Sequence, residues 1–243
     1  MLIRVINPNT TAAMTEKIGV AAREVALPQT RIVATHPRSG PVSIESHFDE
    51  AVAAVGVIEE VRDGERAGTD AYVLACFGDP GLLAAREITR APVIGIAEAA
   101  FHMATLVATR FSVVTTLGRT AIIAEHLLQS YGFSGHCRRV RAAEIPVLEL
   151  ESDPDAAYHR IVEEGRRAKA EDGIGAIVLG CGGMADLRHR IAEAVGLPVV
   201  EGVTAAVKLA EGLVQLGLAT SKHGDLAHPR PKAFTGMFQH LGA

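Results

Sequence analysis

The feature that most constrains the fold of this chain is an internal repeat. Three runs return in the same order: VLACFG (73–78) as VLGCGG (178–183), APVI (91–94) as LPVV (197–200), and, more weakly, RVINPNT (4–10) as SVVTT (112–116). The offsets are 105, 106 and about 108 residues. A period this long exceeds that of any solenoid repeat, so it predicts two similar halves, each the size of a domain.

Within both halves, short apolar runs alternate with longer amphipathic stretches. We expect strands at residues 2–6, 31–34, 71–75, 93–96, 111–115, 177–179 and 199–200, and helices at 11–26, 44–67, 121–130, 155–170 and 203–216. Several of the apolar runs lack polar alternation, as is typical of parallel strands buried on both faces. Strand and helix in alternation predict an α/β fold with parallel sheets.

Composition excludes several classes of protein. The chain has 243 residues, of which 48% are apolar and 21% charged, and its net charge is −4. There is no cluster of lysines and arginines that would suit a nucleic acid. No run approaches the ~18 apolar residues that a membrane helix needs, and the N-terminus is typical of a strand rather than a signal peptide. Because the three cysteines are too widely spaced for a disulfide framework, we expect a cytoplasmic protein. From its charge and its short apolar runs, we expect neither nucleic-acid nor membrane partners.

Two of the cysteines, Cys76 and Cys181, directly follow the matched strands of the two halves. Ligands of open parallel sheets bind beyond the carboxyl ends of the strands. The neighbouring Gly78, Gly182 and Gly183 have no side chains, so ligand atoms can approach the backbone there. Amide N–H groups in such turns can lower the pKa of a thiol and stabilise a developing oxyanion.

If the two halves face each other, the two cysteines confront each other across a cleft. One thiolate could then remove a carbon-bound proton while the other thiol returns a proton to the opposite face. Inversion of configuration needs such a pair, because acid and base exchange roles in the reverse reaction. The sequence therefore predicts a two-base racemase that needs neither a cofactor nor a metal.

Other interpretations of these cysteines remain open. A lone cysteine near a strand is usually a small buried hydrophobe, and a zinc site would need a C-x-x-C motif or paired histidines that the sequence lacks. A non-catalytic ligand-binding protein leaves the matched pair unexplained, and a redox sensor predicts a bridge between Cys76 and Cys181. Cys137 has no counterpart in the other half, so we expect it to be incidental.

Several polar residues near the predicted strand ends are ambiguous. Asn9 either caps the first helix or faces the cleft, and the threonines at 115–116 carry the same ambiguity in the second half. The Asp-Pro pair at 79–80 is typical of a helix start, which favours a structural role for the aspartate. Ser43 and Glu45, at the predicted start of the second helix, could cap it or line the pocket.

Runs along nearly the whole chain resemble the aspartate/glutamate/hydantoin racemase superfamily, and specifically its hydantoin and allantoin racemase branch. They are VINPNTT (5–11), SIE (43–45), ACFGDPG (75–81), GIAEAA (95–100), LGCGGM (179–184) and TSK (220–222). The resemblance implies two pseudo-symmetric lobes with mainly parallel sheets flanked by helices, an active site in the cleft between them, cofactor-free catalysis by both cysteines, and a homo-oligomer. Because the family's second lobe is inserted in its first, we expect one lobe at 1–97 plus 207–243 and the other at 98–206.

The residues that follow the two cysteines indicate the class of substrate. Amino-acid racemases of the superfamily usually place Asn-Thr or Thr there, to hold the amino acid, whereas this chain has Phe77-Gly78 and Gly182-Gly183. Backbone amides suit the carbonyl and N–H groups of a five-membered cyclic ureide. By analogy we expect the substrate to contact Asn9, Ser43, Ile44, Phe77, Gly78, Thr115, Thr116, Gly182 and Gly183.

Three further runs look closer to allantoin racemases than to hydantoin racemases: residues 96–105, 109–117 and 221–226. We therefore expect allantoin as the substrate, with 5-substituted hydantoins as the alternative. Both rings carry an acidic C–H at C5, because the resulting carbanion is delocalised into the C4 carbonyl group. An amino-acid racemase or a non-catalytic binding protein is a more remote alternative.

Overall fold

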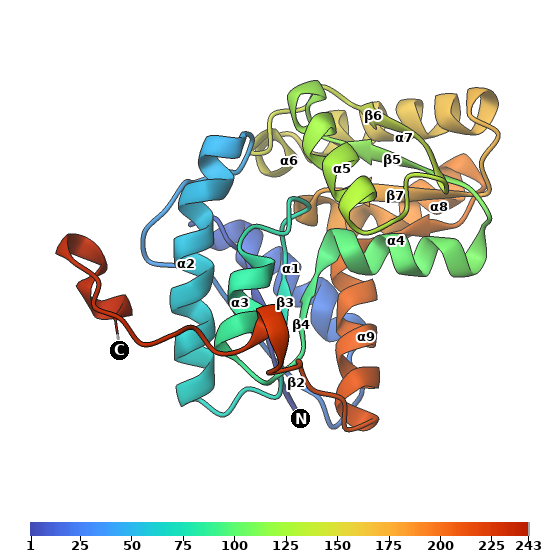
Figure 1. Cartoon of the computed structure of the whole chain (residues 1–243). Coiled ribbons are helices and arrows are strands. Elements are labelled where there is room, and N and C mark those ends of the chain that lie inside the picture. Colours follow the sequence, from blue (N-terminus) through green and yellow to red (C-terminus); the bar gives the residue numbers. More distant parts are fainter. Residues whose placement is uncertain (243) are drawn as a thin grey trace.

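Two parallel sheets of four strands each form the centre of the molecule, which the computed structural model describes over residues 1–242. The first sheet contains β1 (Leu2–Ile6), β2 (Arg31–Thr35), β3 (Ala71–Leu74) and β4 (Val93–Gly95), in the order β2-β1-β3-β4. The second contains β5 (Phe111–Thr115), β6 (Cys137–Ala142), β7 (Ala176–Gly180) and β8 (Val199–Val200), in the order β6-β5-β7-β8. Figure 1 shows the two lobes one above the other. The expected fold class is confirmed.

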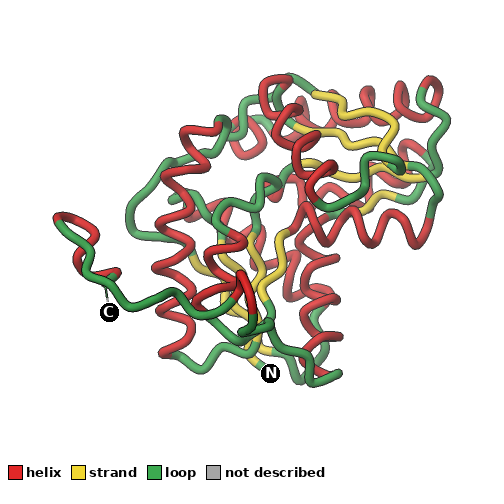
Figure 2. The backbone as a smooth tube through the Cα atoms, in the orientation of Figure 1, coloured by secondary structure: helices red, strands yellow, loops and turns green. Residues whose placement is uncertain are grey.

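The helices repeat along the chain as the strands do (Figure 2). The α-helices are α1 (Ala12–Val25), α2 (His47–Arg66), α3 (Leu82–Ile88), α4 (Ile96–Val107), α5 (Gly118–Ser130), α6 (Glu149–Ser152), α7 (Pro154–Glu171), α8 (Arg188–Val195) and α9 (Gly202–Gln215). The short 3₁₀ helices are η1 (Gly182–Leu187), between β7 and α8, and η2 (Gly224–Leu226) and η3 (Gly236–Leu241), after α9. Apart from α6 and the 3₁₀ helices, each element of the first half has a counterpart in the second, so the repeat extends to the topology.

Each central strand is covered on both faces. In β3, Val73 belongs to the apolar cluster between the lobes, whereas Tyr72 and Leu74 belong to the cluster that includes residues of α2 and α3. In β7, Val178 and Ile177 divide in the same way between the central cluster and that of the second lobe. Since neither face meets water, these strands carry apolar residues at every position.

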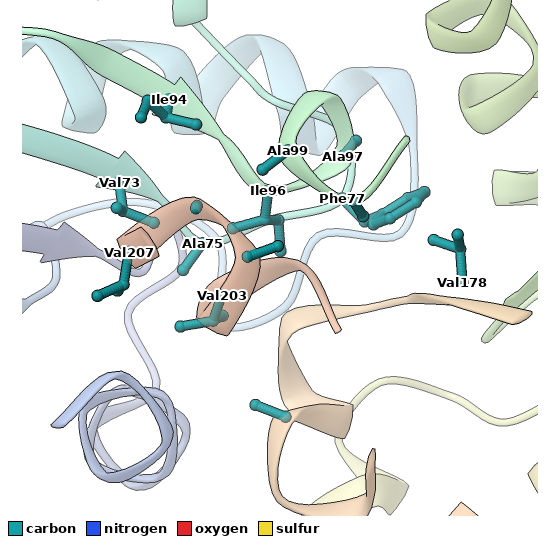
Figure 3. Packing of buried hydrophobic residues seen from close by; sticks show 14 of the residues in the cluster. Val73, Ala75, Phe77, Ile94, Ile96, Ala97, Ala99, Val178, Val203 and Val207 are labelled. Atoms are coloured by element: carbon teal, nitrogen blue, oxygen red, sulfur yellow. The ribbon is translucent and has the colours of Figure 1, made fainter. Parts of the chain in front are cut away.

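Helices α4 and α9 each pack against the sheet of the other half of the chain. α4 follows the first sheet but packs on β7 and β8 of the second, and α9 follows the second sheet but packs on β3 and β4 of the first. Figure 3 shows Val203 and Val207 of α9 beside Val73 and Ala75. The two lobes thus share one continuous core. The predicted lobe boundaries, after residues 97 and 206, fall within the first two turns of these helices and remain a prediction.

Several helix starts differ from the sequence-based expectation, among them that of α5, which begins at Gly118 rather than at 121. α2 begins at His47, because the side chain of Ser46 accepts a hydrogen bond from the amide of Asp49 (3.2 Å); neither Ser43 nor Glu45 caps it. The Asp-Pro pair at 79–80 does not start a helix either, since α3 begins at Leu82. No helix within residues 1–242 is both long and apolar enough to cross a membrane.

Candidate active site

The carboxyl ends of β3 and β7 open into one cavity between the two lobes. Its empty space is about 560 Å³, counting the open mouth. Both lobes contribute to its walls. The lining residues are Asn9, Met14, Ile44, Glu50, Ala75, Cys76, Phe77, Gly78, Thr115, Thr116, Thr120, Ile123, Val147, Gly180, Cys181, Gly182 and Gly183. The structure therefore brings together every predicted site residue except Ser43.

The two cysteine loops have similar backbone geometry and touch each other. The amide of Asp79 donates to the carbonyl oxygen of Cys76 (3.0 Å), and the amide of Met184 donates to that of Cys181 (3.2 Å). A Cβ added at Gly182 would lie 2.7 Å from the carbonyl oxygen of Ala75 in the other loop. Only glycine fits at such a close approach of backbones.

Both cysteines are free thiols whose pKa values are raised. Burial is the main cause, and it raises the pKa of Cys181 to about 11 and that of Cys76 further. The amides of Gly78 and Gly183 donate hydrogen bonds to the two sulfurs and lower the pKa values, as expected. The contribution expected from the amides is therefore present, but desolvation outweighs it, so both thiol pKa values are raised.

The polar residues after β1 and β5 have structural partners as well as places in the cavity wall. The Asn9 side-chain oxygen accepts a hydrogen bond from the amide of Thr11 (2.9 Å) at the start of α1, and its nitrogen donates to the sulfur of Met14 (3.2 Å). The Thr115 hydroxyl donates to the carbonyl oxygen of Gly180 (3.1 Å). Asn9 therefore lies in the cavity wall and closes a turn before α1, but it does not cap the helix, whose N-cap residue is Thr11.

Phe77 and Ser43 differ from the simple expectation of side-chain contact with a ligand. The ring of Phe77 packs edge-on against Phe101, with ring centroids 5.5 Å apart, and the residue is only 7% exposed. Phe77 therefore offers the cavity chiefly its backbone. Ser43 is half-buried outside the cavity wall. Its neighbour Glu45 instead accepts a hydrogen bond from the amide of Val147 (2.7 Å), which ties the two lobes together.

Asp79 lies behind the Cys76 loop rather than in the cavity wall. Its carboxylate accepts hydrogen bonds from the amides of Ala97 (3.2 Å) and Glu98 (3.1 Å) at the start of α4, and from the hydroxyl of Tyr131 (3.0 Å) in the second lobe. Burial raises the pKa of Asp79 to about 7, although these three donors oppose the shift. The predicted structural role is thus present, but the helix that Asp79 caps is α4.

Sequence reasoning missed several residues of the wall, of which Glu50 is the most informative. Its side chain is 17% exposed, and it is the one Asp, Glu, Lys, Arg or His among the residues that line the cavity. An acidic residue in the first turn of a helix is usually explained by the helix dipole, so the sequence pattern gave no reason to place it here. The other missed residues are Met14, Ala75, Thr120, Ile123, Val147 and Gly180. Over residues 1–242, no three His, Cys, Asp or Glu side chains are grouped as a metal site would require.

Comparison with known proteins places the chain in a family. The model of the Asp/Glu/Hydantoin racemase family matches residues 3–210, so the chain belongs to that family. The resemblance inferred from the sequence motifs is therefore confirmed. The match spans both cysteine loops and both sheets.

Within the family, the chain is similar to hydantoin and allantoin racemases. It is 51% identical to the hydantoin racemase of Rhizobium meliloti, over 97% of this chain and 98% of that one. The structure matches allantoin racemase from Klebsiella pneumoniae with a TM-score of 0.98 and 61% identity, covering 100% and 99% of the two chains. It matches allantoin racemase from Pseudomonas fluorescens with a TM-score of 0.94 and 45% identity, covering 97% and 100%.

Proposed function

We propose that the protein racemises a five-membered cyclic ureide at C5, with allantoin as the first candidate and 5-substituted hydantoins as the alternative. The observation that carries this proposal is that Cys76 and Cys181, from equivalent strand ends of two similar lobes, line one cavity. The 61% identity to one allantoin racemase favours allantoin, while the 51% identity to a hydantoin racemase, above the 45% to the second allantoin racemase, keeps hydantoins as the alternative.

In the proposed reaction, the thiolate of one cysteine takes the proton from C5. The electron pair of the C–H bond moves into the adjacent C4 carbonyl group and forms an enolate. The thiol of the other cysteine then donates its proton to the opposite face of C5, and the electron pair returns to carbon. The product is the other enantiomer, and the two sulfurs have exchanged their protonation states, so the reverse reaction uses the same groups in opposite roles.

The backbone around the sulfurs supports the charge that this reaction moves. The amides of Gly78 and Gly183 donate to the sulfurs, so they favour whichever thiolate forms. Thr116 lies in the same wall, and a hydroxyl group at this position can donate to the enolate oxygen. No step requires a cofactor, because the carbonyl group next to C5 accepts the electron pair.

The proposal also covers the location of the protein in the cell and its oligomeric state. Catalysis by free thiols favours a reducing compartment, which supports a cytoplasmic location. Large apolar side chains on α2, Phe48 (76% exposed) and Val52 (42% exposed), favour a homo-oligomer that covers them. Sedimentation analysis of the purified protein tests the second point.

The deciding experiment follows circular dichroism of enantiopure allantoin and of an enantiopure 5-alkyl hydantoin, with each rate corrected for spontaneous racemisation. Proton NMR in D₂O follows loss of the C5 proton in parallel. We expect the ellipticity of allantoin to decay to zero, and faster than that of the hydantoin. A hydantoin that racemises faster reverses the choice of substrate, and no enzymatic rate on either ring overturns the proposal.

A further inference from the structure

One charged group borders the cavity beside the Cys76 loop. Glu50 lies in the first turn of α2, and its Oε1 atom rests against Gly78, where an added Cβ would be 1.8 Å from it. This contact places the carboxylate next to the amide that donates to the Cys76 sulfur. No mechanistic step of the proposed racemisation uses Glu50, so its presence in the wall needs another reason.

The carboxylate of Glu50 has few partners of its own. The Nδ1 atom of His47 lies 3.5 Å from Oε2. Within the described chain, no hydrogen bond to Oε1 and no ion pair with a lysine or arginine is present. An acceptor that is mostly buried, charged and without a strong partner costs free energy unless a ligand supplies a donor.

The rest of the cavity wall contains no cation to balance this charge. None of the lining residues is Lys, Arg or His. A substrate carboxylate would therefore be desolvated beside Glu50 with nothing to neutralise it. A cyclic ureide, in contrast, is uncharged and presents N–H groups that a carboxylate oxygen can accept.

We propose that Glu50 is a substrate-binding residue whose carboxylate accepts a hydrogen bond from an N–H group of the ureide. By its charge, the same carboxylate keeps carboxylate-bearing molecules out of the cavity. This inference rests on the proposed function and adds to it the basis of its substrate class. The same residue supplies an attractive contact for the right substrate and a repulsive one for the wrong one, which is how specificity is commonly built. Burial raises the pKa of Glu50, and His47 opposes that shift.

The first test compares two hydantoins whose C5 substituents have the same shape, an acetamide and an acetate. The ratio of their kcat/KM values measures how strongly the cavity rejects a carboxylate. We expect the wild-type enzyme to prefer the acetamide, and Glu50→Gln, which keeps the shape of the side chain, to lower this preference about 10-fold or more. Glu59→Gln removes a carboxylate farther along α2 and outside the cavity, and its preference should equal that of the wild type.

The second test removes the hydrogen bond from each side in turn. Glu50→Leu should lower kcat/KM for an unmethylated ring by about 10- to 100-fold, the usual worth of a hydrogen bond to a charged group. When the ring nitrogen that Glu50 contacts carries a methyl group, wild type and Glu50→Leu should act equally well. Methylating N1 and N3 separately identifies that nitrogen.

Failure of this inference is distinct from failure of the proposed function. The role of Glu50 alone is overturned if the wild type racemises neutral ureides but the variants do not behave as expected. In that case Glu50→Gln rejects the acetate as strongly as the wild type does, and Glu50→Leu loses the same activity on every methylated ring. A wild type that racemises no ureide overturns both.

Discussion

The two cysteine loops occupy the same place in the repeated topology but differ in what surrounds them. Each begins where the central strand of its sheet ends, and in each the amide three residues later donates to the carbonyl oxygen of the cysteine. Around Cys76 lie the carboxyl groups of Glu50 and Asp79, which raise the pKa of its thiol. Near Cys181, the ammonium group of Lys17 lowers the thiol pKa, while the carboxyl groups of Glu151 and Glu201 raise it.

This difference separates what duplication supplies from what the surroundings add. The repeated backbone gives two thiols equivalent positions, which a reversible proton transfer between two faces requires. Burial and the nearby charges together raise the pKa of Cys76 further than that of Cys181.

The largest expected effect comes from removing either sulfur. Cys76→Ser and Cys181→Ser should each lower the rate of racemisation by about 10²- to 10⁴-fold, because one of the two proton-transfer groups is lost. Each variant should still exchange the C5 proton of one enantiomer with D₂O, and the two variants should prefer opposite enantiomers. Proton NMR of the separate enantiomers measures this exchange. If both variants exchange the same enantiomer, the two cysteines do not act on opposite faces of C5.

A pH profile tests the raised pKa values. Because Cys181 has a pKa of about 11 and the reactive form is its thiolate, the fraction of active enzyme grows as the pH rises toward that value. We expect kcat/KM to rise about tenfold per pH unit between pH 7 and 10, after subtraction of spontaneous racemisation. A rate that is flat from pH 7 upward would mean that one thiolate is already formed at neutral pH.

Two glycine substitutions compare the packing of the loops. In Gly182→Ala the new Cβ meets the backbone of Ala75 at 2.7 Å, whereas in Gly78→Ala it meets the end of the Glu50 side chain, which can rotate away. We expect Gly182→Ala to destabilise the protein by about 1–3 kcal/mol, and Gly78→Ala by less. Thermal unfolding of both variants checks this order, and equal losses would mean that the loops are not in rigid contact.

The smallest effect concerns the ion pair beside Cys181. Lys17 and Glu151 are 2.8 Å apart and shift the pKa of Cys181 in opposite directions. Near pH 8, Lys17→Met should therefore lower kcat/KM by about two- to fivefold, and Glu151→Gln should raise it by a similar factor. Either variant breaks the ion pair, so a purely structural role predicts losses in both.

The strands were largely predictable because their burial is uniform. The predicted limits of β1, β5 and β8 agree with the structure. β6, in contrast, was missed, because its sequence CRRVRA is too rich in arginine to indicate a strand. Arg141 is buried there only because it is paired with Asp172 (2.7 Å), and a pairing across 31 positions leaves no local signal.

The active site was predictable where the repeat and the chemistry coincide. Cys76 and Cys181 combine a matched position with a reactive side chain, so the sequence alone pointed to both. Part of the remaining wall comes from helices that tertiary packing brings to the cavity: Met14 lies on α1, Glu50 on α2 and Ile123 on α5. None of the three differs in sequence pattern from an ordinary helix residue, which explains why they were missed.

The packing of α4 and α9 against the sheet of the other half has a consequence for the synthesis of the chain. The first sheet is complete when β4 ends at Gly95, but the helix that packs on its inner face starts only at Gly202. While the ribosome makes the intervening residues, an apolar surface of the first lobe stays open to solvent and to chaperones. A prematurely terminated product that lacks α9 would leave this surface exposed.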